Sequence, residues 1–438
     1  HRARPRMLRG AGRQGPPHSA RPLYLAMSVE SLYIHIPFCH ARCTYCDFDT
    51  KAACGSQLLS QGNAYVQKLL RRLRDADRAG VLERVETVYI GGGTPTVLGE
   101  RLVDIVREIR GYCNPVEFTC EANPESFTPE LAFALAHAGV TRVSLGVQSL
   151  DDDELALLGR IHSSSQAERA VGLARSCGFS TSVDLICGLS GQTMASWEKT
   201  LDRACALETD HVSVYPLMIE DGTPLSRAIE AGRVAEPDED LQAEMMDVAR
   251  SVLTGRGLER YEVASYARAG KECRHNIAYW TGKSYLGLGR SAASMFSSKD
   301  YGACAKLFDA LDVPSGASRI RIVQLDDEGT AFDVETLSSC EALAEDLMLG
   351  ARMSRGISYD LLRRAAAVIP PSRLLGTLKE AVDLGLLSLS DSWDSLEAAL
   401  SCDVSRSGPC AMPTRQGWLM GNQLYGMLWD LHKDARFC

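Results

Sequence analysis

Six short apolar runs alternate with amphipathic segments over about the first half of the chain. The runs are SLYIHI (31–36), VETVYI (85–90), VEFTCE (116–121), TRVSLGVQ (141–148), STSVDLI (180–186) and HVSVYPL (211–217). Between them, residues 64–80, 100–112 and 128–139 repeat apolar side chains at helical spacing, and Gly139 and Gly178 stand where helix C-caps are expected. Alternation of this kind predicts an α/β fold with a parallel sheet. The number of units fits a partial (β/α)6 barrel better than an open doubly wound sheet.

The pattern changes after residue 222, so we assign a partial barrel to residues 27–222 and an extension that packs on it to residues 223–300. Residues 301–338 are interpreted as an irregular linker. Helical patterns return in CEALAEDLMLGARM, SRLLGTLKEAVDLGLLSL and TRQGWLMGNQLYGMLWDL. Residues 339–438 are therefore predicted to form a C-terminal, mostly helical domain of winged-helix type.

Residues 1–26 differ from the rest of the chain because they contain arginines and no acidic residue. This composition resembles a transit peptide, but the segment lacks an apolar face and begins with His1 rather than methionine. We expect a disordered or non-native leader. If it is a genuine transit peptide instead, the protein is mitochondrial.

Composition restricts the class of protein. The chain has 438 residues, enough for two or three domains, and no run of about 18 uncharged apolar residues that would span a membrane. Its net charge of −9 disfavours nucleic acid as a partner. The 15 cysteines are scattered without the rhythm of a disulfide framework, which favours a reducing compartment such as the cytoplasm.

Three of the cysteines are close together directly after the first predicted strand. Cys39, Cys43 and Cys46 have the spacing C-x3-C-x2-C in a polar loop. A structural zinc site normally has four ligands, and the fourth would have to be His35 or His40. Iron–sulfur clusters are also held by cysteine thiolates, and three cysteines would leave one iron of a cubane cluster open to an outside ligand. Three buried thiols without a metal are the remaining alternative.

Further unusual residues also fall at the ends of predicted strands. The run GGGTP (91–95) follows the second strand, where it is either a tight turn or a place for close backbone approach. Polar side chains stand on or after the third, fourth and fifth strands. Because active sites of β/α barrels form at the carboxyl ends of the strands, these groups are expected to meet at one mouth. The residues concerned are Glu121, Gln148 and Asp184, with Met218 after the sixth strand.

The cysteine motif followed by GGGTP resembles the radical S-adenosylmethionine (SAM) superfamily. The resemblance implies a [4Fe–4S] cluster whose fourth iron is chelated by the amino and carboxylate groups of SAM. Reductive cleavage of SAM would then give a 5′-deoxyadenosyl radical, with the protein supplying position and electrostatics.

Further motifs resemble the coproporphyrinogen-oxidase-like branch of that superfamily: YIHIPFC, CxYCDF, YIGGGTPT, EANPE, VSLGVQS, LLGRIH, VDLICGL and HNIAYW. True oxygen-independent coproporphyrinogen III oxidases have another cysteine where this chain has Phe48. Phe48 and the HNxxYW segment (His275, Asn276, Tyr279, Trp280) resemble the HemW subgroup of haem chaperones. That resemblance implies haem delivery to apo-haemoproteins of the respiratory chain; the alternatives are oxidative decarboxylation of coproporphyrinogen III and radical chemistry on another substrate.

The resemblance also implies roles for individual residues. Cys39, Cys43 and Cys46 would bind the cluster, Tyr33 would lie against SAM, and the backbone of Gly92 and Gly93 would meet its methionyl end. The amino, ribose or carboxylate groups of SAM would be held by Thr94, Glu121, Gln148, Arg160 and Asp184, and Met218 would flank the adenine. For Arg160 a surface salt bridge is the alternative.

His275 is a candidate haem ligand, because a histidine beside aromatic residues suits a flat macrocycle. The alternative is a packed loop histidine, and His35, His40 and Cys273 are rival candidates. Close relatives typically read something like GLGPGAHS, whereas this chain reads GLGRSAAS (287–294), so that Arg290 and Ala293 replace a glycine-rich turn and a histidine. The expected partners are haem, apo-haemoproteins and, if SAM is cleaved, an electron donor such as flavodoxin or ferredoxin; a homodimer is also considered.

Overall fold

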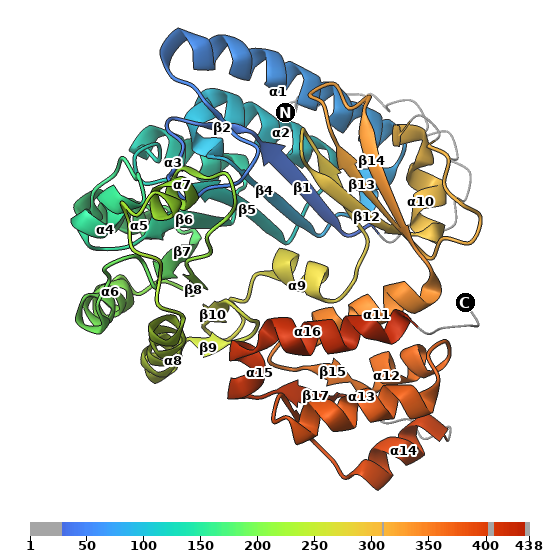
Figure 1. Cartoon of the computed structure of the whole chain (residues 1–438). Helices are drawn as coiled ribbons and strands as arrows, with labels where there is room; N and C mark the ends of the chain where they lie inside the picture. Colours follow the sequence, from blue (N-terminus) through green and yellow to red (C-terminus); the bar gives the residue numbers. More distant parts are fainter. Residues whose placement is uncertain (1–28, 309–310, 402–406, 434–438) are drawn as a thin grey trace, which may run out of the picture.

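A sheet of 12 strands runs through the larger part of the molecule, in the order β14-β13-β12-β11-β1-β4-β5-β6-β7-β8-β10-β9 (Figure 1). The computed structural model describes residues 29–308, 311–401 and 407–433. The expected leader, residues 1–26, lies outside them. Among the described residues, no helix combines the length and the apolar character that crossing a membrane requires. All cysteines in the described part of the chain are free thiols.

The centre of the sheet consists of the six predicted strands, each parallel to its neighbour. They are β1 (Ser31–Ile36), β4 (Thr87–Gly92), β5 (Glu117–Ala122), β6 (Arg142–Gln148), β7 (Ser180–Cys187) and β8 (His211–Pro216). The helices between them are α1 (Gly55–Arg78), α2 (Glu100–Tyr112), α3 (Pro129–Ala138), α4 (Asp152–Leu157), α5 (Ser164–Ser176) and α6 (Met194–Ala206). Gly139 ends α3 in the left-handed conformation, as predicted. The partial (β/α) barrel is therefore confirmed.

Alternate residues of the central strands face opposite sides of the sheet. Val88, Ile90, Phe118 and Val143 are fully buried and belong to the main hydrophobic core, on the side that the helices cover. The residues between them face the inside of the barrel and are mostly polar, in contrast to the apolar filling of a closed β/α barrel. We call the space they enclose the lumen, its end at the carboxyl ends of the strands the mouth, and the opposite end the floor. Lumen-facing residues include Tyr33, His35, Thr87, Tyr89, Glu117, Thr119, Glu121, Arg142, Ser144, Ser182, Asp184, His211 and Ser213.

Further strands extend the sheet on both sides. β11 (Tyr285–Leu288) is parallel to β1, and β12 (Ala293–Ser297), β13 (Arg319–Gln324) and β14 (Phe332–Leu337) continue as an antiparallel meander. At the other edge, β10 (Ser265–Ala267) and β9 (Glu259–Arg260) follow β8. Residues 223–284 also supply α7 (Pro224–Glu230), α8 (Glu239–Gly255) and α9 (Arg274–Trp280).

The expectation of an irregular linker at residues 301–338 was wrong, because β13, β14 and most of α10 (Ser298–Cys304) lie there. The strand RIRIVQ alternates buried Ile320 and Ile322 with charged residues. Because charged residues interrupt its apolar side chains, this segment does not form an apolar run like those of the parallel strands, and the sequence pattern did not indicate a strand.

The C-terminal domain has a hydrophobic core of its own, separate from the barrel core. Its small sheet has the order β15-β17-β16, formed by Ile357–Ser358, Pro409–Pro413 and Leu387–Leu389. Its helices are α11 (Ser339–Gly350), α12 (Tyr359–Ala366), α13 (Pro371–Asp383), α14 (Trp393–Ser401), α15 (Arg415–Leu419) and α16 (Gly421–Trp429). Mostly helical content with a small antiparallel sheet agrees with the expected winged-helix-like domain. Figure 1 shows α9 between the barrel and helices α11 and α16.

Candidate functional site

The cysteine loop lies at the mouth and is fixed on several sides. Cys39 ends the two-residue strand β2 (Phe38–Cys39), which pairs with β3 (Lys51–Ala52). The backbone N–H of Thr44 donates to the carbonyl of Leu158 at 3.0 Å, and the carbonyl of Thr44 accepts from the N–H of Leu225 at 2.8 Å. Segments after β6 and β8 therefore hold the loop between Cys39 and Cys46 in place.

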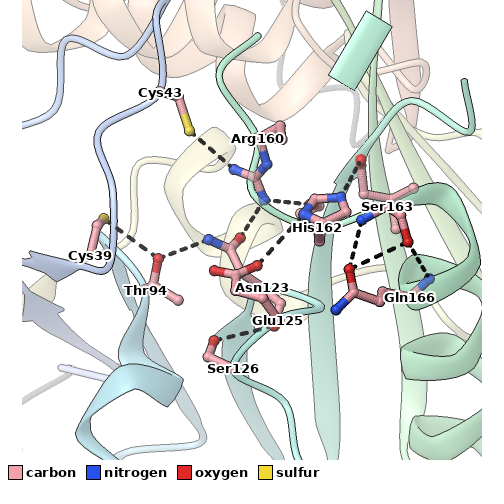
Figure 2. A network of polar contacts seen from close by, with 12 residues as sticks. Cys39, Cys43, Thr94, Asn123, Glu125, Ser126, Arg160, His162, Ser163 and Gln166 are labelled. Carbon is pink, nitrogen blue, oxygen red and sulfur yellow. Dashed lines mark hydrogen bonds and ion pairs between the residues drawn. The ribbon is translucent and has the colours of Figure 1, made fainter. Parts of the chain in front are cut away.

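A chain of polar contacts joins two of the three cysteines (Figure 2). The hydroxyl of Thr94 donates to Cys39 Sγ at 3.5 Å and accepts from the side-chain amide of Asn123 at 2.9 Å. Arg160 Nη2 donates to Asn123 Oδ1 at 2.7 Å, and Arg160 Nη1 donates to Cys43 Sγ at 3.4 Å. Loops after β4, β5 and β6 thus contact the cysteine loop through one continuous network.

Arg160 is a central member of this network rather than a surface residue. Besides its contacts with Cys43 and Asn123, Nη2 donates to the carbonyl of Gly146 at 2.7 Å. A Cβ at position 146 would lie 2.8 Å from Asn123 Oδ1 and 3.2 Å from Arg160 Nη2. The glycine in VSLGVQS therefore lets the guanidinium lie against the strand, with its positive charge beside the cysteine thiols.

Glycines at the end of β4 and directly after it allow a similarly close approach to β1 and to the cysteine loop. A Cβ on Gly92, whose φ is +108°, would lie 2.6 Å from the ring of His35. A Cβ on Gly93 would lie 2.6 Å from the carbonyl oxygen of Phe38 and 3.0 Å from Cys39 Sγ. The Gly93 N–H donates to the carbonyl of Ile36 at 2.8 Å. These contacts explain Gly92 and Gly93 as a requirement for packing the end of β4 against β1 and the cysteine loop.

Two carboxyl groups, Glu121 and Asp184, face the lumen near its mouth. Glu121 accepts from Tyr89 Oη at 2.8 Å and from the N–H of Gly92 at 3.1 Å, and Asp184 accepts from the hydroxyl of Ser144 at 3.4 Å. Burial raises the pKa of Glu121 to about 7 and that of Asp184 to about 6. Both groups would be stabilised in their charged form by a cation at the mouth.

Of the other predicted SAM contacts, Tyr33 lies in the middle of β1, level with Tyr89, and Gln148 and Met218 lie at the mouth. Tyr33 Oη is 3.0 Å from His35 Nδ1. Gln148 has a φ of +66°, which is unusual for a residue other than glycine and marks local strain at the end of β6. The side chain of Met218 is 66% exposed. Their contacts with SAM stay predictions.

The residues at the mouth fit a thiolate-bound cluster in their chemistry. Arg160 and Thr94 donate toward two of the sulfurs, while burial raises the pKa of the Cys39 and Cys46 thiols. In the described part of the chain, no three or more His, Cys, Asp or Glu side chains are arranged around a point that would hold a single ion. The sulfurs of a cubane site bind three different irons, so they need not converge on one point. His35 Nε2 is buried beside Gly92 and has no hydrogen-bond partner among the residues that the structure describes.

His275 lies at the floor, and its surroundings argue against its expected role as haem ligand. Its side chain is 1% exposed. Nδ1 lies 3.0 Å from the hydroxyl of Thr87, and Nε2 lies 2.9 Å from Tyr279 Oη. Glu117 accepts from the backbone N–H of His275 at 2.9 Å. An axial ligand needs a free ring nitrogen, and both nitrogens of His275 are engaged in packing α9 against the sheet.

Two discriminating positions of the sequence lie beside the mouth. Phe48 is 57% exposed, two residues after the last cysteine of the motif. Arg290, which departs from the glycine-rich turn of close relatives, donates from Nε to Asp49 at 2.7 Å, and the Ser291 hydroxyl donates to the same carboxylate at 2.7 Å. The altered turn therefore attaches to the end of the cysteine loop.

Sequence reasoning assigned no role to Asn123 or Tyr89, although both connect predicted site residues. Asn123 bridges Thr94 and Arg160, and Tyr89 holds the carboxylate of Glu121. The quoted motifs EANPE and YIGGGTPT contain both residues. Asn123 comes two residues after Glu121, and Tyr89 comes two residues before Gly91. Their places within these motifs could therefore have identified them as site residues.

Comparison with known proteins agrees with this geometry. Residues 33–204 match the Radical SAM superfamily. The "Heme chaperone HemW" of Bacillus subtilis is 30% identical over 405 residues, which is 91% of this chain and 98% of that protein. The mouse protein "Radical S-adenosyl methionine domain-containing protein 1, mitochondrial" is 35% identical over 392 residues, 85% of this chain and 86% of the relative.

A solved structure also shares the fold over nearly the whole chain. The coproporphyrinogen III oxidase HemN of Escherichia coli superposes with a TM-score of 0.70 at 21% sequence identity and covers 92% of this chain and 90% of its own. From the site geometry, the superfamily match and relatives aligned along nearly their full length, we conclude that the chain belongs to the HemW branch of the radical SAM superfamily.

Proposed function

We propose that the protein is a haem chaperone, which binds haem as cargo and delivers it to apo-haemoproteins of the respiratory chain. The strongest support is the alignment with a "Heme chaperone HemW" over 98% of that relative's length. Membership of the radical SAM superfamily implies a [4Fe–4S] cluster and SAM as cofactors. When bound, the two together supply one-electron chemistry.

The chemistry of the side chains at the mouth supports assigning them to the two cofactors. Cys39, Cys43 and Cys46 would hold the cluster, with Arg160 donating toward the Cys43 thiolate. The carboxyl groups of Glu121 and Asp184 face the side on which the cationic groups of SAM would lie. An electron donor such as flavodoxin or ferredoxin is required only if SAM is cleaved in the working cycle.

The proposal is tested by titrating the anaerobically reconstituted protein with haem, with and without SAM, and following the Soret band. We expect stoichiometric haem binding and transfer of bound haem to an apo-cytochrome on mixing. Absence of haem binding would contradict the proposal. Formation of protoporphyrinogen from coproporphyrinogen III, with reductant and SAM, would instead identify an oxidative decarboxylase.

The cellular location is a separate proposal. Names of vertebrate relatives, such as the mouse and bovine proteins, include the word mitochondrial. This supports interpreting the arginine-rich residues 1–26 as a transit peptide rather than as a non-native leader. Fusion of residues 1–40 to a fluorescent protein tests it: mitochondrial import is expected, and a cytoplasmic signal would contradict it.

A further inference from the structure

Arg142 is a buried arginine at the floor of the lumen. It begins β6, and its side chain is on the same face of the strand as Ser144, whose hydroxyl contacts the lumen-facing Asp184. Arg142 is 4% exposed. Its register partner on β5 is Thr119, which is fully buried. The two side chains therefore lie next to each other inside the barrel.

Both side chains contain polar atoms without a partner. Arg142 Nε and Thr119 Oγ1 are inaccessible and make no hydrogen bond, and no ion pair or hydrogen bond of the Arg142 side chain is found with any described residue. The other deeply placed arginines differ: Arg319 is paired with Glu345 and Asp346. Buried polar groups are normally satisfied, and an unpaired buried guanidinium is strongly destabilising.

The nearest acidic side chains are already committed to other groups. Glu117 accepts from the backbone N–H groups of Arg274 and His275, both at 2.9 Å, and so caps the start of α9. Glu121 accepts from Tyr89 Oη and the Gly92 N–H. The carboxylate of Glu117 attracts the Arg142 guanidinium electrostatically. No side chain in the described part of the chain, however, accepts a hydrogen bond from the guanidinium.

A carboxylate is the group that matches this arrangement best. The planar guanidinium presents parallel N–H donors that fit a carboxylate bidentately, and a hydroxyl next to it adds a third donor. A cluster of aromatic side chains packs beside this polar point: the rings of Tyr89 and His275 are 5.2 Å apart, and those of His275 and Tyr279 are 4.8 Å apart. An organic ligand with a flat apolar body and a carboxylate would satisfy both features.

We propose that Arg142, together with the hydroxyl of Thr119, binds a carboxylate of the ligand that enters the lumen, and that this carboxylate is a propionate of haem. The second half of the inference rests on the proposed function. SAM also has a carboxylate, but its predicted contacts Gln148 and Arg160 lie at or beyond the carboxyl end of β6, whereas Arg142 begins that strand. Haem would then be recognised at the floor by its propionate, without an axial bond to His275.

The test compares haem with haem dimethyl ester, in which both propionates are blocked, by absorbance titration of the reconstituted full-length protein. For the unaltered protein we expect at least tenfold tighter binding of haem than of the ester. Arg142→Met should weaken haem binding at least tenfold and leave ester binding unchanged, and Thr119→Val should give a smaller loss of the same kind. Arg175→Met is the matched control, because Arg175 pairs with Glu208 on the outer surface, and it should bind both compounds like the unaltered protein.

Two further readouts separate a ligand anchor from a structural residue and from a SAM site. Removing a buried guanidinium that makes no hydrogen bond should leave the melting temperature of the ligand-free protein unchanged or raised, whereas a structural arginine would lower it when removed. SAM affinity, measured by calorimetry, should be the same in Arg142→Met and the unaltered protein. If SAM binding is lost and haem binding is kept, the carboxylate belongs to SAM and the haem assignment is overturned.

The remaining outcomes also decide the inference. If Arg142→Met binds haem as tightly as the unaltered protein, ordered water satisfies these groups and the inference fails while the proposed function stands. If the unaltered protein binds no haem, the proposed function fails and the inference with it. Should Arg142→Met not fold, Arg142→Lys and Thr119→Val decide, because both keep the volume nearly constant and alter only the donors.

Discussion

The mouth and the floor of the lumen are both lined by polar side chains, but these are satisfied in different ways. At the mouth, Thr94, Asn123 and Arg160 bond to one another and to the sulfurs of the cysteine loop. At the floor, the motif histidine His275 uses both nitrogens for packing, while Arg142 Nε has no hydrogen-bond partner among the described residues. At the mouth, the motif residues therefore form the candidate site. At the floor, the motif residue His275 supports the structure, and the proposed ligand-binding group is Arg142, which lies outside the quoted motifs.

The largest effect is expected at the mouth from Cys43→Ala. Removal of one of three thiolates should abolish the cluster, because no other cysteine of the triad can replace it. Iron content should fall from about four per chain to near zero, and the paramagnetic signal of the reduced cluster should disappear. Cys54→Ala is the control, since Cys54 is exposed and lies outside the triad. A full cluster in Cys43→Ala would show that the ligand assignment is wrong.

Close packing at the mouth predicts the next effect. Gly93→Ala places a methyl group against the backbone carbonyl of Phe38, which cannot move aside easily. We expect a loss of about 2–3 kcal/mol in the free energy of unfolding together with poor cluster incorporation. In contrast, Gly111→Ala in α2 meets nothing within 4 Å and should stabilise the helix by up to about 1 kcal/mol. Equal denaturant midpoints for the two variants would contradict the packing explanation.

At the floor, His275→Ala separates packing from ligation. The substitution leaves Thr87 and Tyr279 without their partner, so the free energy of unfolding should fall by about 1–3 kcal/mol. The position of the Soret band and the haem affinity should stay the same, because no nitrogen of His275 is free to bind iron. A shifted Soret band with weaker haem binding would restore His275 as an axial ligand.

The smallest effect is a dependence of stability on pH that comes from the mouth. Glu121 has a pKa of about 7 in the folded protein, raised mainly by burial, whereas in the unfolded chain it loses its proton near pH 4. Between these values the unfolded state binds fewer protons, so stability falls as the pH rises and is level above about pH 7. Glu121→Gln removes this contribution. Its melting temperature should therefore fall less between pH 5 and pH 8 than that of the unaltered protein, and equal slopes would show that Glu121 is ionised throughout.

Sequence alone was sufficient for the parallel centre of the fold. The six strands with their helices appear where apolar alternation predicted them, because parallel strands are covered on their outer face and read as apolar runs. β13 was missed, since Arg319 and Arg321 alternate with its buried isoleucines and the strand lies near the sheet edge. Apolar runs indicate strands of the parallel centre, but they do not indicate an antiparallel strand near the sheet edge such as β13.

The candidate site was predictable to the extent that its residues stand in recognisable motifs. The cysteines, GGGTP and Arg160 meet at one mouth, because the carboxyl ends of parallel strands lie at the same edge. The position of Arg142 could not be interpreted in this way. Its lack of a partner depends on how Glu117 is used by α9, a segment more than 150 residues away in sequence, and no local pattern encodes that. The same holds for His275, whose nitrogens are engaged by Thr87 from another strand and Tyr279.

The division of the lumen into two binding ends is tested most directly by measuring SAM and haem affinities on two variants of the same reconstituted protein. Arg160→Met removes the guanidinium at the mouth, and Arg142→Met removes the one at the floor. We expect Arg160→Met to weaken SAM binding at least tenfold with haem binding kept, and Arg142→Met to do the reverse. If each variant loses both ligands equally, or neither loses any, the mouth and the floor do not bind separate ligands and the central claim is contradicted.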